Sequence, residues 1–180
     1  MKVVETALRG VLILEIEPIT DERGFFARTW DRADLLGRGL TADLDQVSIA
    51  HNEVAGTLRG LHYQPAPHDE AKTVRCISGA VFDVAVDLRK GSPTCLRWVG
   101  VELSAMNRRS LFIPEGCAHG YVTLTDNADV QYQISKPYQA AAARGYRWDD
   151  GTLGIGWPVP VVRISRRDAA LPHVQAGDYR

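Results

Sequence analysis

The chain has 180 residues, of which 45% are hydrophobic and 24% are charged, values typical of a folded globular protein rather than a disordered or transmembrane one. Its 21 Lys and Arg side chains nearly balance 22 Asp and Glu side chains, so the net charge of -1 supplies no overall field that attracts nucleic acid or an anionic membrane. Any anion-binding site must therefore be local, and we expect no nucleic-acid or membrane partner.

The chain is predicted to form a single domain spanning residues 1–180, because it contains no internal repeat, low-complexity tract or linker-like run of Gly, Ser and Pro. The first 16 residues alternate charged and apolar side chains and lack the continuous apolar stretch of a signal peptide or membrane helix. The three cysteines, Cys76, Cys95 and Cys117, are odd in number and form no close pair, which argues against a disulfide framework. These features predict a cytoplasmic protein.

In chain order, the first predicted elements are a strand at residues 11–16 and a short helix at residues 32–37. Residues 73–77 are rich in β-formers and predict a strand, and Ser78-Gly79-Ala80 after them predicts a hairpin turn in which Gly supplies a positive φ. The partner strand is predicted at residues 81–88, where apolar side chains alternate with Asp83 and Asp87 as in a half-buried strand.

The second half of the chain continues this pattern. Strands are predicted at residues 98–103, 110–113, 120–124 and 130–134, each bounded by Gly, Pro, Asn or Asp. A helical turn is predicted at residues 165–170, where Ser165 and Asp168 have the spacing of a capping box. Many short strands with little helix predict an all-β sandwich or closed barrel and argue against a parallel α/β fold.

Two segments carry side chains suited to chemistry. Residues 56–64 place Arg59 three positions before His62, a spacing that suits anion binding beside a proton acceptor but equally suits an Arg at the rim and a His packed in a barrel wall. Residues 114–120 resemble the second conserved motif of cupins, which delivers a His, here His119, into the mouth of the barrel. The His-x-His cluster of metal-binding cupins is missing, since His68 follows His62 only after a Pro-bracketed stretch, so we expect no metal site.

With both motifs considered, the chain resembles the dTDP-4-dehydrorhamnose 3,5-epimerase family. The resemblance rests on seven segments in the family's order, at residues 21–26, 59–64, 82–89, 91–94, 113–120, 147–150 and 154–158. It implies a cupin-type double-stranded β-helix, a jelly-roll barrel with a few short helices, usually assembled as a homodimer. It also implies action on a nucleoside-diphosphate 4-keto-6-deoxyhexose, by default the conversion of dTDP-4-dehydro-6-deoxy-D-glucose to dTDP-4-dehydro-L-rhamnose, without a cofactor.

The chemistry implied by this resemblance needs a base and an acid on opposite faces of the sugar. The 4-keto group acidifies the protons on carbons 3 and 5, so a base can remove one and leave an enolate that is reprotonated from the other face. The resemblance implies that His62 is the base, Asp168 its acidic partner and Tyr132 the proton donor. An unperturbed imidazole has a pKa of about 6.5, which suits proton removal near neutral pH. Without the resemblance, Asp168 could instead serve the helix cap, and Tyr132, on the same face as Val130 and Ile134, could belong to the core.

The resemblance further implies a set of substrate-binding residues. They are Arg23, Phe26, Arg28, Gln46, Ser48, Arg59, Lys72, His119, Tyr138 and Arg167. Arg59 and Arg23 suit the diphosphate, because guanidinium pairs well with phosphate oxygens, and Lys72 would lie near the keto oxygen, where a fixed cation stabilises the enolate. Tyr138 would stack on the base. His119 would complete the sugar pocket, although a buried structural His is an alternative.

Four positions that match substrate contacts in the family carry residues that differ from the usual ones, namely Arg28, Ser48, Ala143 and Arg167. Three alternatives therefore stay open: an epimerase that acts at carbon 3 or carbon 5 alone, a non-catalytic sugar-binding cupin, and a metal-dependent cupin oxygenase. The nucleotide carrier could also differ from thymidine. The joint presence of the base, the donor, the acid and Lys72 argues against the second, and the missing His-x-His cluster argues against the third. No Gly-rich strand–helix fingerprint is present, so we expect no NAD requirement.

Overall fold

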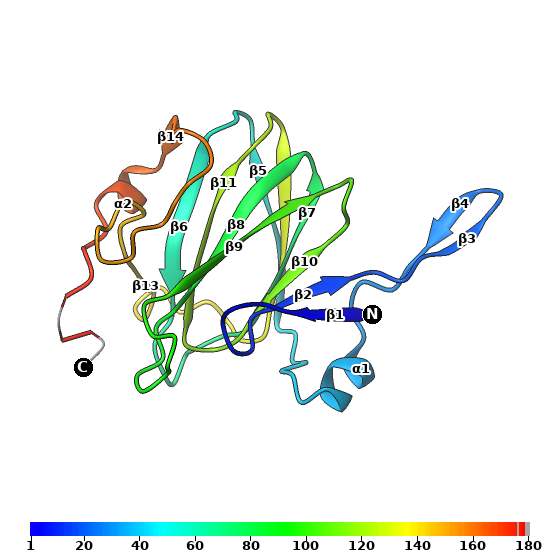
Figure 1. Cartoon of the computed structure of the whole chain (residues 1–180), viewed down its shortest axis with the longest axis horizontal. Coiled ribbons are helices and arrows are strands. Elements are labelled where there is room, and N and C mark those ends of the chain that lie inside the picture. The colour runs from blue at the N-terminus through cyan, green and yellow to red at the C-terminus, as the bar shows by residue number, and fades with distance from the viewer. Residues whose placement is uncertain (176, 179–180) are drawn as a thin grey trace.

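Two facing β-sheets form the body of the computed structural model, which describes residues 1–175, 177 and 178 (Figure 1). The first sheet has the order β1 (Lys2–Glu5), β2 (Leu12–Glu15), β10 (Ser110–Ile113), β7 (Lys72–Ser78), β12 (Ala128–Ile134) and β5 (Gln46–Asn52). The second has the order β13 (Arg144–Gly145), β6 (Thr57–Tyr63), β11 (Cys117–Thr123), β8 (Ala80–Asp87) and β9 (Trp98–Ser104), with β14 (Arg163–Ile164) also pairing with β6. The predicted all-β architecture is confirmed.

Helix is confined to two short elements. α1 (Arg32–Gly37) begins where it is predicted to, because the Asp31 side chain accepts hydrogen bonds from the backbone N–H groups of Ala33 and Asp34. α2 (Arg166–Ala169) follows Ser165, whose side chain accepts from the N–H of Asp168, so the predicted capping geometry is also confirmed. None of the described helices is long and apolar enough to cross a membrane.

The hairpin predicted at residues 78–80 is wrong. β7 pairs with β10 and β12 in the first sheet, whereas β8 pairs with β9 and β11 in the second, so the turn is a corner that passes the chain between sheets. Gly79 does adopt a positive φ, of 71°, and a Cβ there would lie 2.4 Å from the Thr125 hydroxyl. The glycine signal therefore marked a real turn, but it could not indicate which strands the turn joins.

The prediction that β8 is half-buried is also wrong, because both of its faces are covered. One face packs in the core between the two sheets, where Val81 and Ala85 lie. The other face, with Val84 and Val86, packs against side chains of the C-terminal segment, including Leu153. The two aspartates that mimic a solvent-facing alternation are themselves buried and paired, Asp83 with a histidine and Asp87 with an arginine.

A two-stranded hairpin, β3 (Ile19–Asp21) and β4 (Gly24–Phe26), projects from the body beyond the β1–β2 edge (Figure 1). Every residue of both strands is exposed, including the large side chains Ile19, Phe25 and Phe26. An isolated two-stranded hairpin is marginally stable in water, and exposed apolar side chains gathered on it indicate a surface that makes contacts.

Asp87 is the centre of a hydrogen-bonded network at the end of β8. Its carboxylate accepts from the Arg89 guanidinium at 2.8 Å, from the Ser92 hydroxyl at 2.6 Å and from the Thr94 hydroxyl at 2.7 Å. Burial alone would raise the pKa of this carboxyl, but these donors outweigh it and hold the pKa well below its usual value. Ionised Asp87 therefore stabilises the fold above the unfolded-state pKa of about 3.9, and this contribution is lost as the pH falls toward the lower folded-state value.

We expect Asp87→Asn to lower the free energy of unfolding by about 3 kcal/mol at pH 7, because Asp87 is fully buried and its charge is what the Arg89, Ser92 and Thr94 donors surround. The deficit should narrow below about pH 4, where the parent loses the same interaction. Denaturant unfolding at several pH values measures both effects. Asp149→Asn is the matched control, since Asp149 pairs with Arg147 at the same two-residue spacing but on the surface, and it should cost less than about 1 kcal/mol. Equal losses in the two variants would contradict the prediction.

Candidate active site

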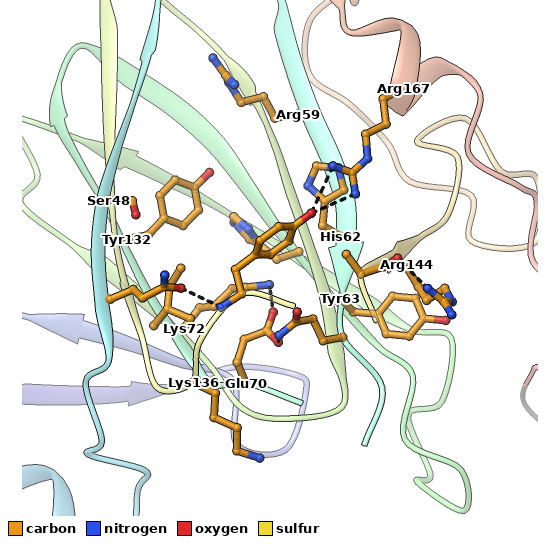
Figure 2. Close-up of a pocket in the computed structure, with 16 residues that line it drawn as sticks. Ser48, Arg59, His62, Tyr63, Glu70, Lys72, Tyr132, Lys136, Arg144 and Arg167 are labelled. Carbon is orange, nitrogen blue, oxygen red and sulfur yellow. Dashed lines mark hydrogen bonds and ion pairs between the residues drawn. The ribbon is translucent and has the colours of Figure 1, made fainter. Parts of the chain in front are cut away.

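One cavity, of about 280 Å³, brings together side chains from both sheets and from the loop after β12 (Figure 2). Most of the predicted site residues line it. These are Gln46, Ser48, Arg59, His62, Lys72, His119, Tyr132, Tyr138 and Arg167. A second hollow shares Arg59, His62, Tyr132 and Arg167 with it and includes Asp168.

An irregularity in β6 directs both Arg59 and His62 into this cavity. In a regular strand, residues three positions apart point to opposite faces. Here His62 pairs with His119 and Arg59 pairs with Tyr121, so three positions of β6 are matched by two of β11. Such a bulge re-aims side chains, and it explains how the Arg59–His62 spacing noted in the sequence serves one site.

His62 forms a dyad with Asp168, which lies 106 positions away in the sequence. The His62 Nε2 atom lies 2.8 Å from the Asp168 Oδ1 atom, and the Oδ2 atom accepts from the backbone N–H of Gly60. The imidazole is 42% exposed toward the cavity, whereas the carboxylate side chain is 7% exposed. Burial alone would raise the pKa of the Asp168 carboxyl, but His62, the Gly60 N–H and Ser165 outweigh it and hold the pKa below its usual value. An ionised partner of this kind orients an imidazole and stabilises its protonated form.

The two interpretations of Asp168 considered from the sequence do not exclude each other. Its backbone N–H donates to the Ser165 side chain at the start of α2, while its side chain faces His62. The cap fixes the position from which the carboxylate reaches the imidazole.

Tyr132 lies across the cavity from His62, on β12 (Figure 2). Its ring packs edge-on against His119 with centroids 5.7 Å apart. Burial, together with the neighbouring Tyr121 and Asp83, raises its pKa well above the usual value for tyrosine. The hydroxyl therefore keeps its proton at neutral pH and can act as a donor.

His119 is both buried and part of the cavity wall. Its Nε2 atom lies 2.7 Å from the Asp83 Oδ1 atom. Because His119 is opposite His62 in the β6–β11 register, this second imidazole–carboxylate pair neighbours the first. Burial raises the pKa of the Asp83 carboxyl, an effect opposed by His119 and by the charge of Lys72.

Cations dominate the charged side chains of the cavity. They are Arg59, Lys72, Lys136, Arg144 and Arg167, and Glu70 is the one carboxylate among the lining residues. Arg59 is held by the Asn52 side chain and the His51 carbonyl. A chain with a net charge of -1 therefore has a local site suited to an anionic ligand.

Tyr138 closes one side of the cavity and remains half exposed. Its backbone N–H donates to the Gln46 side chain at 2.9 Å, and the Arg167 guanidinium lies 3.4 Å from its hydroxyl. An exposed, anchored aromatic ring of this kind offers a face on which a planar ligand group can stack.

Three predicted residues do not reach the cavity of their own chain. Arg23 and Phe26 lie on the projecting β3–β4 hairpin, where Arg23 is paired with Asp21, and Arg28 follows the hairpin and pairs with Asp31 at 2.8 Å. Within one chain, these residues are not brought together with His62.

The sequence interpretation missed Glu70, Lys136, Arg144 and Asp83 as members or supports of the site. The first three belong to loops or to a strand end, where no periodicity marks the direction of a side chain. Asp83 did carry a signal in the sequence, since it is an acidic residue within a strand rich in apolar side chains. A carboxylate buried in such a strand needs a partner. Among the described residues, no group of three or more His, Cys, Asp or Glu side chains is arranged to hold a metal ion.

A family model described as dTDP-4-dehydrorhamnose 3,5-epimerase matches residues 5–176. The chain belongs to this epimerase family. The dTDP-4-dehydrorhamnose 3,5-epimerase of Salmonella typhimurium is 45% identical over 176 residues, which are 96% of this chain and 94% of the relative.

Two crystal structures of the epimerase family are similar along nearly their whole length. The enzyme of Bacillus anthracis, with TDP and PPi bound, has 39% identity and a TM-score of 0.92, covering 96% of this chain and 99% of that chain. The dTDP-6-deoxy-D-glucose-3,5-epimerase of Legionella pneumophila, in complex with dTDP-4-keto-L-rhamnose, has 36% identity and a TM-score of 0.88, covering 97% and 99%. The fold is the cupin-type jelly roll that the sequence predicts.

In this member of the epimerase family, the bulge of β6 depends on a close backbone contact. Gly60 has a φ of 123°, and a Cβ there would lie 2.6 Å from the Gly120 Cα atom and 2.9 Å from the His119 carbonyl oxygen. Both the conformation and the space therefore require glycine. Because Gly60 also donates to Asp168, the contact connects β11, β6 and the dyad.

We expect Gly60→Ala to lower the free energy of unfolding by more than about 3 kcal/mol, since backbone must move to admit the methyl group. Gly39→Ala is the control, because Gly39 also has a positive φ, of 71°, has open space around its Cβ position and lies outside the projecting hairpin. It carries only the strain of the positive φ, about 1–3 kcal/mol. Thermal and denaturant unfolding measure the two costs. A Gly60→Ala cost no greater than that of the control would show that the β6–β11 contact is less tight than described.

Proposed function

We propose that the protein converts dTDP-4-dehydro-6-deoxy-D-glucose to dTDP-4-dehydro-L-rhamnose by epimerisation at carbons 3 and 5. The observation that carries this proposal is the His62–Asp168 dyad facing Tyr132 across a cation-lined cavity, in a chain of the 3,5-epimerase family. Two proton-transfer groups on opposite sides of a pocket are what inversion at carbon requires.

In the first step, the His62 imidazole takes the proton from the carbon next to the keto group. The electron pair of the broken C–H bond forms the enolate, whose negative charge collects on the former keto oxygen. Asp168 stabilises the imidazolium that results. Lys72 stabilises the enolate oxygen as a fixed cation, and His119 completes the wall around the sugar.

In the second step, Tyr132 gives its hydroxyl proton to the same carbon from the opposite face. The raised pKa of this tyrosine does not prevent the transfer, because an enolate carbon is a far stronger base than a phenolate. The imidazolium then loses a proton and the phenolate regains one through solvent, which restores the starting state. The same cycle at the second carbon completes the conversion.

The nucleotide end of the substrate is assigned to the outer part of the cavity. Arg59 and Arg167 pair with the diphosphate, since guanidinium groups match phosphate oxygens in geometry and charge. The thymine base stacks on Tyr138, with Gln46 and Ser48 beside it.

The active form is proposed to be a homodimer in which the β3–β4 hairpin of each chain enters the cavity of the other. The support is that Arg23, Phe26 and Arg28 have substrate-binding roles by the family resemblance but lie outside the cavity of their own chain. The hairpin exposes apolar side chains, with Phe26 69% exposed, as expected for a surface that a partner covers.

The chain is further proposed to act as a single cupin domain in the cytoplasm. The support for this location is that all three cysteines are free, as is usual in a reducing compartment.

His62→Ala is expected to lower the rates of deuterium uptake from heavy water and of epimerisation by about 10²–10⁴-fold, because no base remains to form the enolate. Tyr132→Phe should keep deuterium uptake, because His62 can remove a proton and return a deuteron to the same face, while inversion falls by a similar factor. NMR of a 4-keto sugar nucleotide in heavy water follows both processes at each carbon.

These two variants are informative only if they keep the thermal midpoint of the parent, which is measured alongside. Near-parental deuterium uptake in His62→Ala would show that His62 is not the base. Epimerisation at the parental rate in Tyr132→Phe would show that Tyr132 is not the proton donor. Uptake at one carbon only in the parent would favour the single-carbon epimerase.

Complementation tests the shared site of the dimer. One chain carries His62→Ala, and the other carries Arg23→Ala with Phe26→Ala, so each homodimer should be inactive. Co-expressed, they form mixed dimers in which one cavity is intact, and activity should recover to about a quarter of the parental level when chains pair at random.

The matched control for complementation is co-expression of His62→Ala with Tyr132→Phe, each of which damages its own cavity. No intact cavity forms in that mixed dimer, so activity should stay at the level of the single variants. Recovery in the control, or none in the test pair, would contradict the exchange of hairpins.

A further inference from the structure

Glu70 is the one carboxylate among the described lining residues of a cavity whose other charged Lys, Arg, Asp and Glu side chains are all cations. Its Oε1 atom lies 2.8 Å from the Lys72 Nζ atom, and the two side chains are 7% and 11% exposed. Figure 2 shows the pair at the end of the cavity remote from Arg59. A carboxylate at this depth weakens the attraction of the site for an anionic ligand, and burying a charge is costly unless it is paired, so the contact with Lys72 is the feature to explain.

The second oxygen of Glu70 is also held. Its Oε2 atom accepts from the Gln64 side-chain amide at 2.6 Å, and that same amide nitrogen donates to the His68 carbonyl. The Gln64 carbonyl oxygen accepts from the backbone N–H of Gln139, in the loop that carries Tyr138. The carboxylate is therefore anchored on one side by a buried amide that is itself fixed at both ends.

A lysine needs such an anchor more than an arginine does. Its ammonium is a compact, strongly hydrated point charge on a flexible four-carbon stem, and it has no fork geometry to fix its direction. Electrostatic stabilisation of a developing oxyanion requires a donor placed within a few tenths of an ångström, and a displacement of about 1 Å can cost about 10²-fold in rate.

We propose that Glu70 is the positioning residue of Lys72: it holds the ammonium where the enolate oxygen forms and acts on the reaction only through that ammonium. This inference rests on the proposed function, in which Lys72 stabilises the enolate. Glu70 itself touches no reacting atom.

A double-mutant cycle in deuterium uptake and epimerisation tests the proposal, with four proteins: the parent, Glu70→Gln, Lys72→Met and the double variant. Glu70→Gln should lower kcat at least about tenfold and change KM less than about threefold, because the lost interaction concerns the enolate more than the bound substrate. In the Lys72→Met background, the same change should cause no further loss of kcat, since the group that Glu70 positions is gone.

Glu15→Gln is the matched control. Glu15 lies on β2, outside the cavity, and pairs with Lys2 and Arg109. Its substitution removes a Glu–Lys ion pair away from the site and should leave kcat unchanged. Glu70→Asp keeps the charge on a stem one methylene shorter and should give a kcat between those of the parent and Glu70→Gln. It also decides the question if Glu70→Gln does not fold.

Each outcome decides for or against the positioning role. Losses of kcat that multiply in the double variant would mean that Glu70 acts independently of Lys72 and would overturn the proposal, as would parental kcat in both Glu70 variants. A loss confined to KM would also overturn it. If the parent itself takes up no deuterium at either carbon, the proposed function fails first, and the inference fails with it.

Discussion

The bulge where β6 passes β11 is the constraint on which the site depends. It places Arg59 and His62, three positions apart, on the same side of one strand, and it sets His62 opposite His119 in the register. Each imidazole then meets a carboxylate from a different element, Asp168 from α2 and Asp83 from β8. The contact is possible only because Gly60 and Gly120 have no side chains between the two backbones.

The charge of the cavity is opposite in sign to the net charge of the whole chain. A net charge of -1 is combined with a cavity that has five lining cations and a single lining carboxylate. The cations are fixed rather than merely gathered, as with Arg59 on the Asn52 side chain and Lys72 on Glu70. Preorganised charges stabilise a developing anion without reorganising during a reaction, and this cavity presents charges that are held in that way.

The β3–β4 hairpin stands apart from the two sheets and takes no part in the cavity of its own chain (Figure 1). Its apolar side chains Ile19, Phe25 and Phe26 are exposed, with the Arg108 guanidinium stacked on the Phe25 ring, and the residues that resemble substrate contacts lie on the hairpin or just after it. If the hairpin enters the cavity of a partner chain as proposed, assembly becomes a condition for activity. In that proposed arrangement, one jelly roll would supply a rigid pocket of its own and a separate element to the pocket of its partner.

The sequence by itself determined the fold class and most strands, because period-2 patterning is a local property of the chain. It also pointed, through the resemblance of several segments to one family, to most of the side chains that the structure gathers in the cavity. It also determined the capping of α2 by Ser165. The tertiary structure alone decided that β7 and β8 join different sheets, since the turn at Gly79 suits either arrangement. It alone brought Glu70 to Lys72 from a loop without periodicity. The pairing of His62 with Asp168 was implied by the family resemblance, but no local pattern predicts it. A contact between residues 106 positions apart depends on how whole strands pack, so the structure supplies its geometry.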